Sequence, residues 1–212
     1  VVNAPTGNTI AAAEHAFALM MSLARNIPQA DASMRRGEWT RSKFTGVELR
    51  NKTLGIIGLG RVGSEVATRA RAFQMNILAF DPYVSNERAR SLGVEAVPLN
   101  RLLSESDFIS IHTPLTSGTK SLIGESEFQL LKPGVRIVNA ARGGLVDEDL
   151  LHTALNDGLV GGAALDVYPS EPPTELRLID NLNAVLTPHL GASAEEAQAE
   201  GAGYVVVERS TV

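Results

Sequence analysis

Residues 53–63 read TLGIIGLGRVG, an apolar run followed by three glycines in the spacing G-x-G-x-x-G. The run predicts a buried strand, and the residues after it, SEVATRARAF, predict a helix that begins at Arg61. In such a strand-turn-helix unit, Gly58 allows the tight turn and Gly60 lets the backbone approach a pyrophosphate. Gly63 lets the helix pack close to the sheet. The free N–H groups of the first helical turn would then face the phosphates, so the stretch predicts a dinucleotide site.

A carboxylate closes the next apolar run, NILAFD, at Asp81. It follows the glycines by roughly twenty residues, the spacing at which a carboxylate reaches the hydroxyls of the adenosine ribose. The same negative charge would repel a 2′-phosphate on that ribose. The pattern therefore predicts NAD as the cofactor rather than NADP.

Short apolar runs alternate with helical patterns along the rest of the chain. After TLGIIG come NILAF, DFISIHT, VRIVNAA, GGAALDV and AVLTPH, separated by helical segments such as SNERARSL, LNRLLSES and VDEDLLHTALNDG. This alternation is typical of a parallel sheet covered by helices on both faces. The fold class that we expect is therefore α/β, a Rossmann-type doubly wound parallel sheet.

The composition narrows the classes of function. The 212 residues are 44% hydrophobic and 20% charged, with a formal net charge of −5 and no cysteine. The charge balance and the lack of a basic cluster argue against nucleic acid as a partner. The longest apolar stretch is interrupted by Glu14 and His15, so no membrane span is expected. Without cysteine we expect neither disulfides nor thiolate metal sites, we assign no metal ligands, and we expect a cytoplasmic protein.

A first helix is expected over residues 8–25, NTIAAAEHAFALMMSLAR, with Asn8 or Thr9 as its cap. Apolar residues occupy almost every face of this helix, so it must be covered. We expect the cover to come from the rest of the fold and from a second subunit, giving a homodimer through residues 8–45. A helix covered entirely within one chain is the alternative. The stretch around Trp39 is expected to be a loop that lies over the neighbouring subunit.

Ligands of an open parallel sheet lie beyond the carboxyl ends of its strands, so the residues that close the apolar runs are the candidates. Arg142, Asp166 and His189 close the last three runs, and Glu171 follows in a proline-rich loop. Hydride transfer between a nicotinamide and a secondary alcohol needs an acid–base group, and histidine titrates in the useful range. It also needs a cation to hold a carboxylate substrate, which an arginine can do through two parallel hydrogen bonds.

The chain resembles the D-isomer-specific 2-hydroxyacid dehydrogenase family nearly from end to end. The resemblance is carried, in the family's order, by NAPTGNTIAAAEH, GLGRVG, HTPLTSGTKSLI, VNAARGGLVDEDLL, ALDVYPSEPP and TPHLGAS. It implies that Arg142 orients the substrate carboxylate and that His189 exchanges a proton with the hydroxyl or ketone. It also implies that Glu171 hydrogen-bonds His189 and favours its charged form. NAPTGN and PHLGASAEEAQ are most similar to members that act on a phosphorylated 2-hydroxy acid.

The same resemblance implies contacts with NAD. Arg61 and Val62 would lie at the pyrophosphate, and Asp81 at the adenosine ribose. Thr113 would line the adenosine side, and Asp166 would bond the carboxamide of the nicotinamide. The full set of implied cofactor-binding residues is Gly58, Gly60, Arg61, Val62, Gly63, Asp81, Thr113, Ala140, Ala141, Arg142, Asp166, His189, Gly191 and Ala192.

The resemblance also divides the chain. Residues 1–50 would be a crossing and dimerisation segment, residues 51–192 the nucleotide domain, and residues 193–212 a return helix toward a smaller domain that binds substrate. By the resemblance, most of that second domain would be absent from this sequence, which begins with Val1 rather than Met. Because a cleft between two domains excludes water and aligns the reactants, we expect the chain to bind NAD and NADH but to turn substrate over very weakly or not at all.

Two other functions stay open. One is a different 2-hydroxyacid dehydrogenase, acting on glycerate, glyoxylate or lactate. The other is an NADH-sensing corepressor of the same fold, which can retain a similar set of Arg, Glu and His. Among the remaining histidines, His15 and His152 are interpreted as structural, and His112 as a neighbour of the cofactor without a chemical role.

Overall fold

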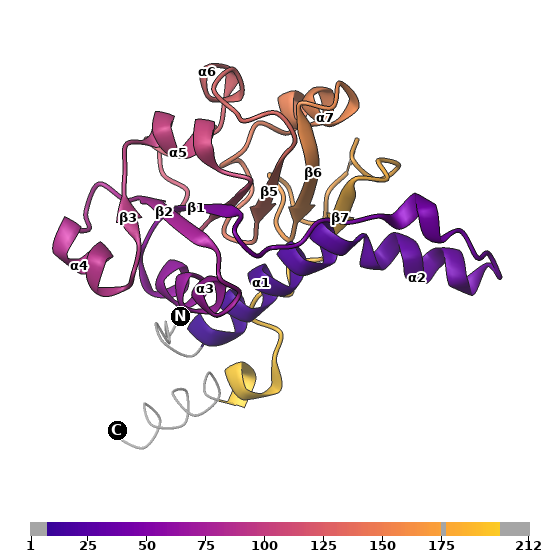
Figure 1. Cartoon of the computed structure of the whole chain (residues 1–212), viewed down its shortest axis with the longest axis horizontal. Coiled ribbons are helices and arrows are strands. Elements are labelled where there is room, and N and C mark those ends of the chain that lie inside the picture. The colour runs from indigo at the N-terminus through magenta and orange to yellow at the C-terminus, as the bar shows by residue number, and fades with distance from the viewer. Residues whose placement is uncertain (1–7, 175–176, 200–212) are drawn as a thin grey trace.

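The computed structural model describes residues 8–174 and 177–199. Within them, seven strands form one parallel sheet in the order β3-β2-β1-β4-β5-β6-β7 (Figure 1). The strands are β1 (Thr53–Ile57), β2 (Asn76–Phe80), β3 (Glu95–Ala96), β4 (Phe108–Ile111), β5 (Val135–Asn139), β6 (Val160–Leu165) and β7 (Ala184–Leu186). The strand order runs outward in both directions from β1, which places a topological switch point between β1 and β4. The expected Rossmann-type sheet is confirmed.

The six longer strands end in one row. Ile57 pairs with Phe80 on one side and with Ile111 on the other. The same row continues through the last residues of β5, β6 and β7. The residues that follow these strands therefore begin along one edge of the sheet, where the candidate site was expected.

Helices cover both faces of the sheet, as Figure 1 shows. On one face lie α1 (Thr9–Arg25) and α3 (Arg61–Ala72), and on the other lie α5 (Leu99–Glu105), α6 (Glu125–Phe128) and α7 (Glu148–Asn156). The short helix α4 (Asn86–Ser91) packs beside β3. The sheet thus separates two hydrophobic clusters, because its apolar strands are buried from both sides.

An arm extends from this body. It consists of α2 (Ile27–Arg35) and the 3-10 helix η1 (Arg41–Phe44), and it points away from the sheet in Figure 1. Trp39, between the two helices, is 73% exposed. The stretch around Trp39 was expected to be a loop, and η1 occupies part of it.

The first helix is covered mainly by its own chain. Seven of its side chains are buried, among them Ala13, Ala16 and Met20, and it packs on α3, β5, β6 and β7. The expectation that the rest of the fold covers this helix is confirmed for these residues, and the share expected of a second subunit stays a prediction. The N-cap Asn8 makes no side-chain capping hydrogen bond.

Two further details differ from the sequence-based expectation. Strand β3 was missed because it has two residues, both exposed, and so carries no apolar run. A last helix was expected over residues 193–208; residues 195–199 are helical, and residues 200–208 lie outside the described part of the chain. Among the helices described, none has the length and apolar character needed to cross a membrane.

Candidate functional site

The loop between β1 and α3 needs its glycines for steric reasons. A Cβ on Gly58, whose φ is +93°, would lie 2.6 Å from the carbonyl oxygen of His112, and one on Gly63 would lie 2.1 Å from that of Gly58. A Cβ on Gly60, in contrast, would meet nothing within 4 Å. Gly60 is also the N-cap of α3 and has no side chain to cover the helix end. The loop therefore forms an open backbone cradle at a helix N-terminus, a form that fits a pyrophosphate.

The carboxylate of Asp81 supports this loop from the end of β2. Its Oδ2 accepts a hydrogen bond from the N–H of Leu59 at 2.8 Å, and its Oδ1 accepts one from the N–H of Tyr83 at 2.9 Å. Each carboxylate oxygen can accept a second hydrogen bond, so both can still receive a ribose hydroxyl. Arg61 is exposed and Val62 half-buried at the start of α3 beside the same loop.

The loop after β5 presents Arg142. The buried side chain of Asn139 shapes this loop: its Nδ2 donates to the carbonyl of Arg142 at 2.9 Å, and its Oδ1 accepts from the N–H of Ala141 at 3.1 Å. The guanidinium of Arg142 is exposed, and its Nη1 donates to the carbonyl of Ala141 at 2.6 Å. Ala140 and Ala141 are half-buried. A cation thus stands at the edge of the sheet with most of its donors accessible.

The loop after β6 brings Glu171 to His189. Nδ1 of His189 lies 2.7 Å from Oε2 of Glu171, and the N–H of Tyr168 donates to Oε1 of Glu171 at 3.0 Å. These hydrogen bonds, first that from His189, hold the pKa of Glu171 below its usual range. The side chains of His189 and Glu171 are 47% and 38% exposed, so a small molecule can reach the pair. The arrangement has the form of an acid–base histidine oriented by a carboxylate.

Gly143 brings the loop after β5 into contact with the loop after β6. Gly143 packs against the backbone of Tyr168 so closely that a Cβ on it would lie 1.9 Å from the Tyr168 carbonyl oxygen. The loop that carries Arg142 is therefore in direct contact with the loop that carries Glu171. The edge gathers a cation, a carboxylate and an imidazole, which are the groups that the sequence predicted for a 2-hydroxy acid.

Asp166 lies at the end of β6 but is not open to solvent. Its carboxylate is fully buried and accepts four hydrogen bonds. Oδ1 accepts from the N–H of Leu190 at 2.8 Å and from Oγ1 of Thr187 at 2.5 Å, and Nε2 of His15 lies 3.0 Å from it. Oδ2 accepts from the N–H of Gly191 at 2.8 Å. Burial by itself raises the pKa of Asp166, but the donors, first among them His15, outweigh it and hold the pKa below its usual range.

This network bears on the contact expected between Asp166 and the nicotinamide. Oδ1 already receives three protein donors, whereas Oδ2 receives one, so a carboxamide would bond Asp166 at Oδ2 and would have to reach this buried carboxylate. Its contacts in the structure are to the turn that carries His189. Gly191 is buried in that turn, and Ala192 beyond it is exposed.

His112 follows β4 at the switch point. Its Nε2 lies 2.8 Å from Oγ of Ser110, and burial lowers the pKa of His112 to about 4. The imidazole is therefore neutral near pH 7. Thr113, which comes next, is half-buried, and its backbone lies beside Gly58.

Sequence reasoning missed two residues of this edge. Tyr168 was given no role, yet its N–H holds Glu171 and its hydroxyl donates to the carbonyl of Thr187 at 3.0 Å. His15 was interpreted as structural without a partner, and its ring contacts the buried Asp166 from α1.

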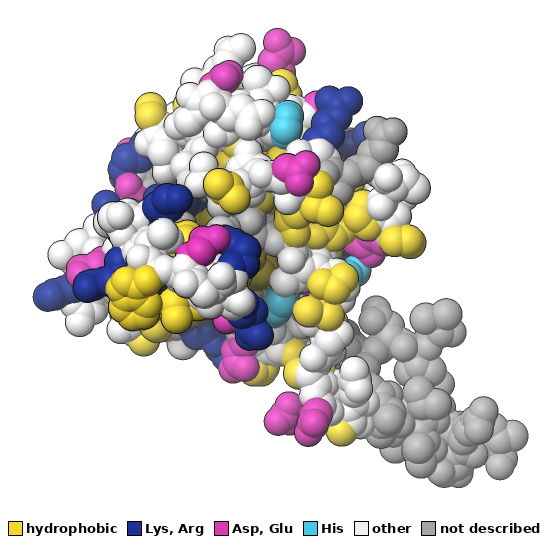
Figure 2. Space-filling view, turned by 90° about the vertical axis from the view of Figure 1, so that its right-hand side faces the viewer, with side chains coloured by type: hydrophobic (Ala, Val, Ile, Leu, Met, Phe, Trp, Pro, Cys, Tyr) yellow, Lys and Arg dark blue, Asp and Glu magenta, His cyan; other side chains and the backbone are white. Residues whose placement is uncertain are grey.

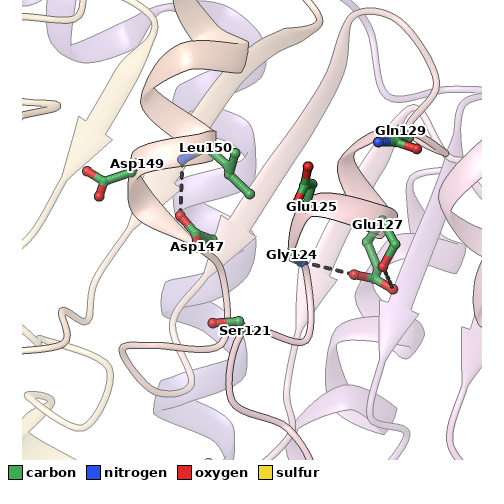
Figure 3. A pocket seen from close by; sticks show the side chains of 9 residues that line it. Ser121, Gly124, Glu125, Glu127, Gln129, Asp147, Asp149 and Leu150 are labelled. Carbon is green, nitrogen blue, oxygen red and sulfur yellow. Dashed lines mark hydrogen bonds between the residues drawn. The ribbon is translucent and has the colours of Figure 1, made fainter.

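An acidic hollow lies away from this edge, between α6 and α7 (Figure 3). Its carboxylates serve the helix ends: Asp147 accepts from the N–H of Leu150 at the start of α7, and Glu127 accepts from the N–H of Gly124 at the start of α6. No group of three potential metal ligands is found among the residues that the structure describes. Helix capping accounts for these two carboxylates, and the other two that line the hollow, Glu125 and Asp149, lie in the first turns of α6 and α7.

The chain is similar in sequence to known dehydrogenases. The family described as D-isomer specific 2-hydroxyacid dehydrogenase, NAD binding domain, matches residues 17–191. A D-3-phosphoglycerate dehydrogenase of Archaeoglobus fulgidus is 54% identical over 98% of this chain, and that of Bacillus subtilis is 50% identical over 98%. The chain spans only 40% of the length of each of these relatives.

Solved structures share the fold. A glyoxylate reductase from Paecilomyes thermophila superposes with a TM-score of 0.86 at 41% identity, over 92% of this chain and 60% of that one. A D-lactate dehydrogenase from Aquifex aeolicus, solved in complex with NAD and lactic acid, gives 0.87 at 31% identity, over 96% of this chain and 67% of the other.

Proposed function

The chain belongs to the D-isomer-specific 2-hydroxyacid dehydrogenase family, whose NAD-binding domain it carries, and from this premise we propose that it is the nucleotide-binding catalytic part of a D-3-phosphoglycerate dehydrogenase. The proposed reaction moves a hydride between NAD and 3-phosphoglycerate, with 3-phosphohydroxypyruvate as the ketone, and serves L-serine biosynthesis. A cytoplasmic location is part of this proposal. The identities near 50% to relatives of that name favour it over a glyoxylate-type or lactate-type enzyme and over a corepressor.

The observation that carries the proposal is the backbone cradle with its neighbouring acid. The residues for NAD are those of the loop after β1, from Gly58 to Gly63, with Asp81 beside it. When bound, the nicotinamide supplies or accepts the hydride. The carboxylate of Asp81 favours a free 2′-hydroxyl, because a 2′-phosphate would bring like charges together.

Three side chains are assigned to the substrate. Arg142 binds its carboxylate through the exposed guanidinium. His189 holds or releases the proton of the hydroxyl at Nε2, since Nδ1 is engaged by Glu171. Glu171 orients the ring and stabilises the imidazolium. With the cation on the loop after β5 and His189 held by Glu171 from the loop that adjoins it, the chain's own residues fix the polar ends of a 2-hydroxy acid.

Titration calorimetry tests the cofactor assignment. We expect the wild-type chain to bind NADH more tightly than NADPH. Asp81→Ala should lower the affinity for NADH about tenfold, because a hydrogen bond to a charged group is lost. The same variant should reduce the difference in affinity between NADH and NADPH. Asp157→Ala, an exposed position past the end of α7, is the control and should bind as wild type. A wild-type chain that binds neither nucleotide would contradict the proposed function.

We further propose that the chain forms a two-fold homodimer through residues 8–45, with the domain division 1–50, 51–192 and 193–212. Support comes from the arm: Ile27, Met34 and Trp39 are 50%, 54% and 73% exposed. A groove beside the arm is lined by α2, η1 and residues 179–184. Figure 2, which views the molecule from the side toward which the arm points, shows several hydrophobic groups on this face. A two-fold partner would cover the arm with the same surface of its own.

Sedimentation velocity at tens of micromolar protein tests the dimer. Wild type is expected to sediment as a dimer, and Trp39→Glu as a monomer, because the buried carboxylate would lack a partner. Tyr83→Glu changes a side chain that is 96% exposed after β2, away from the arm, and should stay dimeric. Monomeric wild-type protein would count against the proposal.

A further inference from the structure

His15 links the first helix to the turn that carries His189. Its Nε2 lies 3.0 Å from Oδ1 of Asp166 and 3.3 Å from Oγ1 of Thr187. The side chain is 19% exposed, so the contact is largely shielded from water.

The carboxylate of Asp166, which His15 contacts, holds the turn of residues 189–191 in place. Oδ1 and Oδ2 of Asp166 accept from the N–H groups of Leu190 and Gly191, the two residues that follow His189. His189 itself has φ +55°, a left-handed conformation that is uncommon for a residue with a side chain. A Cβ on Gly191 would lie 3.3 Å from Oδ2 of Asp166, so the turn sits tightly on the carboxylate.

The packing of helix α1 fixes the position of the His15 ring. On either side of it, Ala13 and Ala16 are buried against the body. The preceding residue, Glu14, forms an ion pair with Arg69 of α3, with 2.9 Å between Oε1 and Nη2. The helix can therefore neither rotate nor slide without breaking these contacts, and the donor stays where Asp166 needs it.

We propose that His15 is a positioning residue for the reaction: by donating from Nε2 to Asp166, it fixes the turn of residues 189–191 and so keeps His189 against Glu171. The inference rests on the proposed function for its consequence in catalysis, but the linkage itself concerns the folded chain alone. Asp166 receives three donors on Oδ1, and His15 is the one that comes from outside the loop after β7. Without His15, the carboxylate of Asp166 would be hydrogen-bonded only by the loop after β7, which is the loop whose turn it fixes.

Nuclear magnetic resonance on the 212-residue chain tests the linkage. In His15→Leu, which lacks a donor, the amide protons of Leu190 and Gly191 are expected to exchange about tenfold faster, because their local opening becomes easier. The hydrogen-bonded ring N–H signal of His189 should broaden or disappear. His15→Gln places an amide N–H near the position of Nε2 and should restore both signals. A role in packing alone would predict no difference between the leucine and glutamine variants.

His152→Leu is the matched control, because His152 lies on α7 in the other helix layer and bonds Asn156. It should leave the exchange rates and the His189 signal as in wild type. Should His15→Leu fail to fold, His15→Asn, whose amide is too short to reach Asp166, replaces it. Wild-type exchange and ring signals in His15→Leu would overturn the proposal, as would a glutamine variant that behaves like the leucine one. Binding of NADH by wild type is measured separately, so failure of the proposed function is told apart from failure of the linkage.

Discussion

Gly143→Ala is expected to destabilise the protein by about 3 kcal/mol, the upper part of the usual range for overpacking. The new Cβ would lie 1.9 Å from the carbonyl oxygen of Tyr168, 2.0 Å from its carbonyl carbon and 2.5 Å from the nitrogen of Pro169. All three are backbone atoms, so no side chain can rotate away to make room. Since the N–H of Tyr168 holds Glu171, the displaced backbone would also draw Glu171 away from His189.

Chemical denaturation measures this loss as a lower midpoint at unchanged slope. Gly118→Ala is the control, because a Cβ there would meet only Oγ1 of Thr116 at 3.9 Å. That variant should stay within about 0.5 kcal/mol of wild type. Equal stability of the two variants would show that the loops carrying Arg142 and Glu171 are not packed as described.

The second large effect is a loss of stability in mild acid caused by His112. Burial lowers its pKa from 6.5 to about 4. Between these two values the unfolded chain binds a proton on this histidine and the folded chain does not, so acid favours unfolding. The stabilisation is fully present above pH 6.5 and is lost as the pH falls to about 4, by up to about 3 kcal/mol for this residue.

Denaturation midpoints of wild type and His112→Gln, measured from pH 7 to pH 4, isolate this contribution. Glutamine cannot titrate but can still bond Oγ of Ser110. The variant should therefore lose less stability over the interval, although carboxylates with lowered pKa, such as Asp107 and Asp166, act in both proteins at lower pH. Parallel curves for the two proteins would refute the assignment to His112.

The local parts of the site were predictable from local sequence. The glycine spacing after β1 placed the cradle, and the carboxylate at the end of NILAFD placed Asp81, because both depend on residues near one strand-helix turn. The pairing of Glu171 with His189 came from the resemblance to a family. Neither periodicity nor spacing relates a proline-rich loop to the end of another strand, so the residues alone gave no reason to join these two.

Contacts between distant segments were harder to foresee. His15 was interpreted as structural because a histidine in an apolar helix carries no sign of its partner. The contact of Asp166 with the nicotinamide was implied by the resemblance and stays a prediction. The burial of Asp166 under the turn of residues 189–191 follows only from how that turn folds back. The cover of α1 was assigned to the rest of the fold and to a second subunit; the sheet and α3 provide the first part, through contacts between segments far apart in the chain.

The sequence by itself determined the parallel α/β sheet, the dinucleotide loop and the edge at which the functional groups gather. Apolar runs, glycine spacing and strand ends act over a few residues, and parallel strands bring their carboxyl ends to one edge without further information. Only the tertiary structure decided which donors bond the carboxylate of Asp166 and that Gly143 packs on the backbone of Tyr168. It also decided which side chains of the first helix are buried by its own chain. Those outcomes depend on the packing of helices and loops that lie far apart in the chain, and the pattern of any one segment does not encode its distance to another.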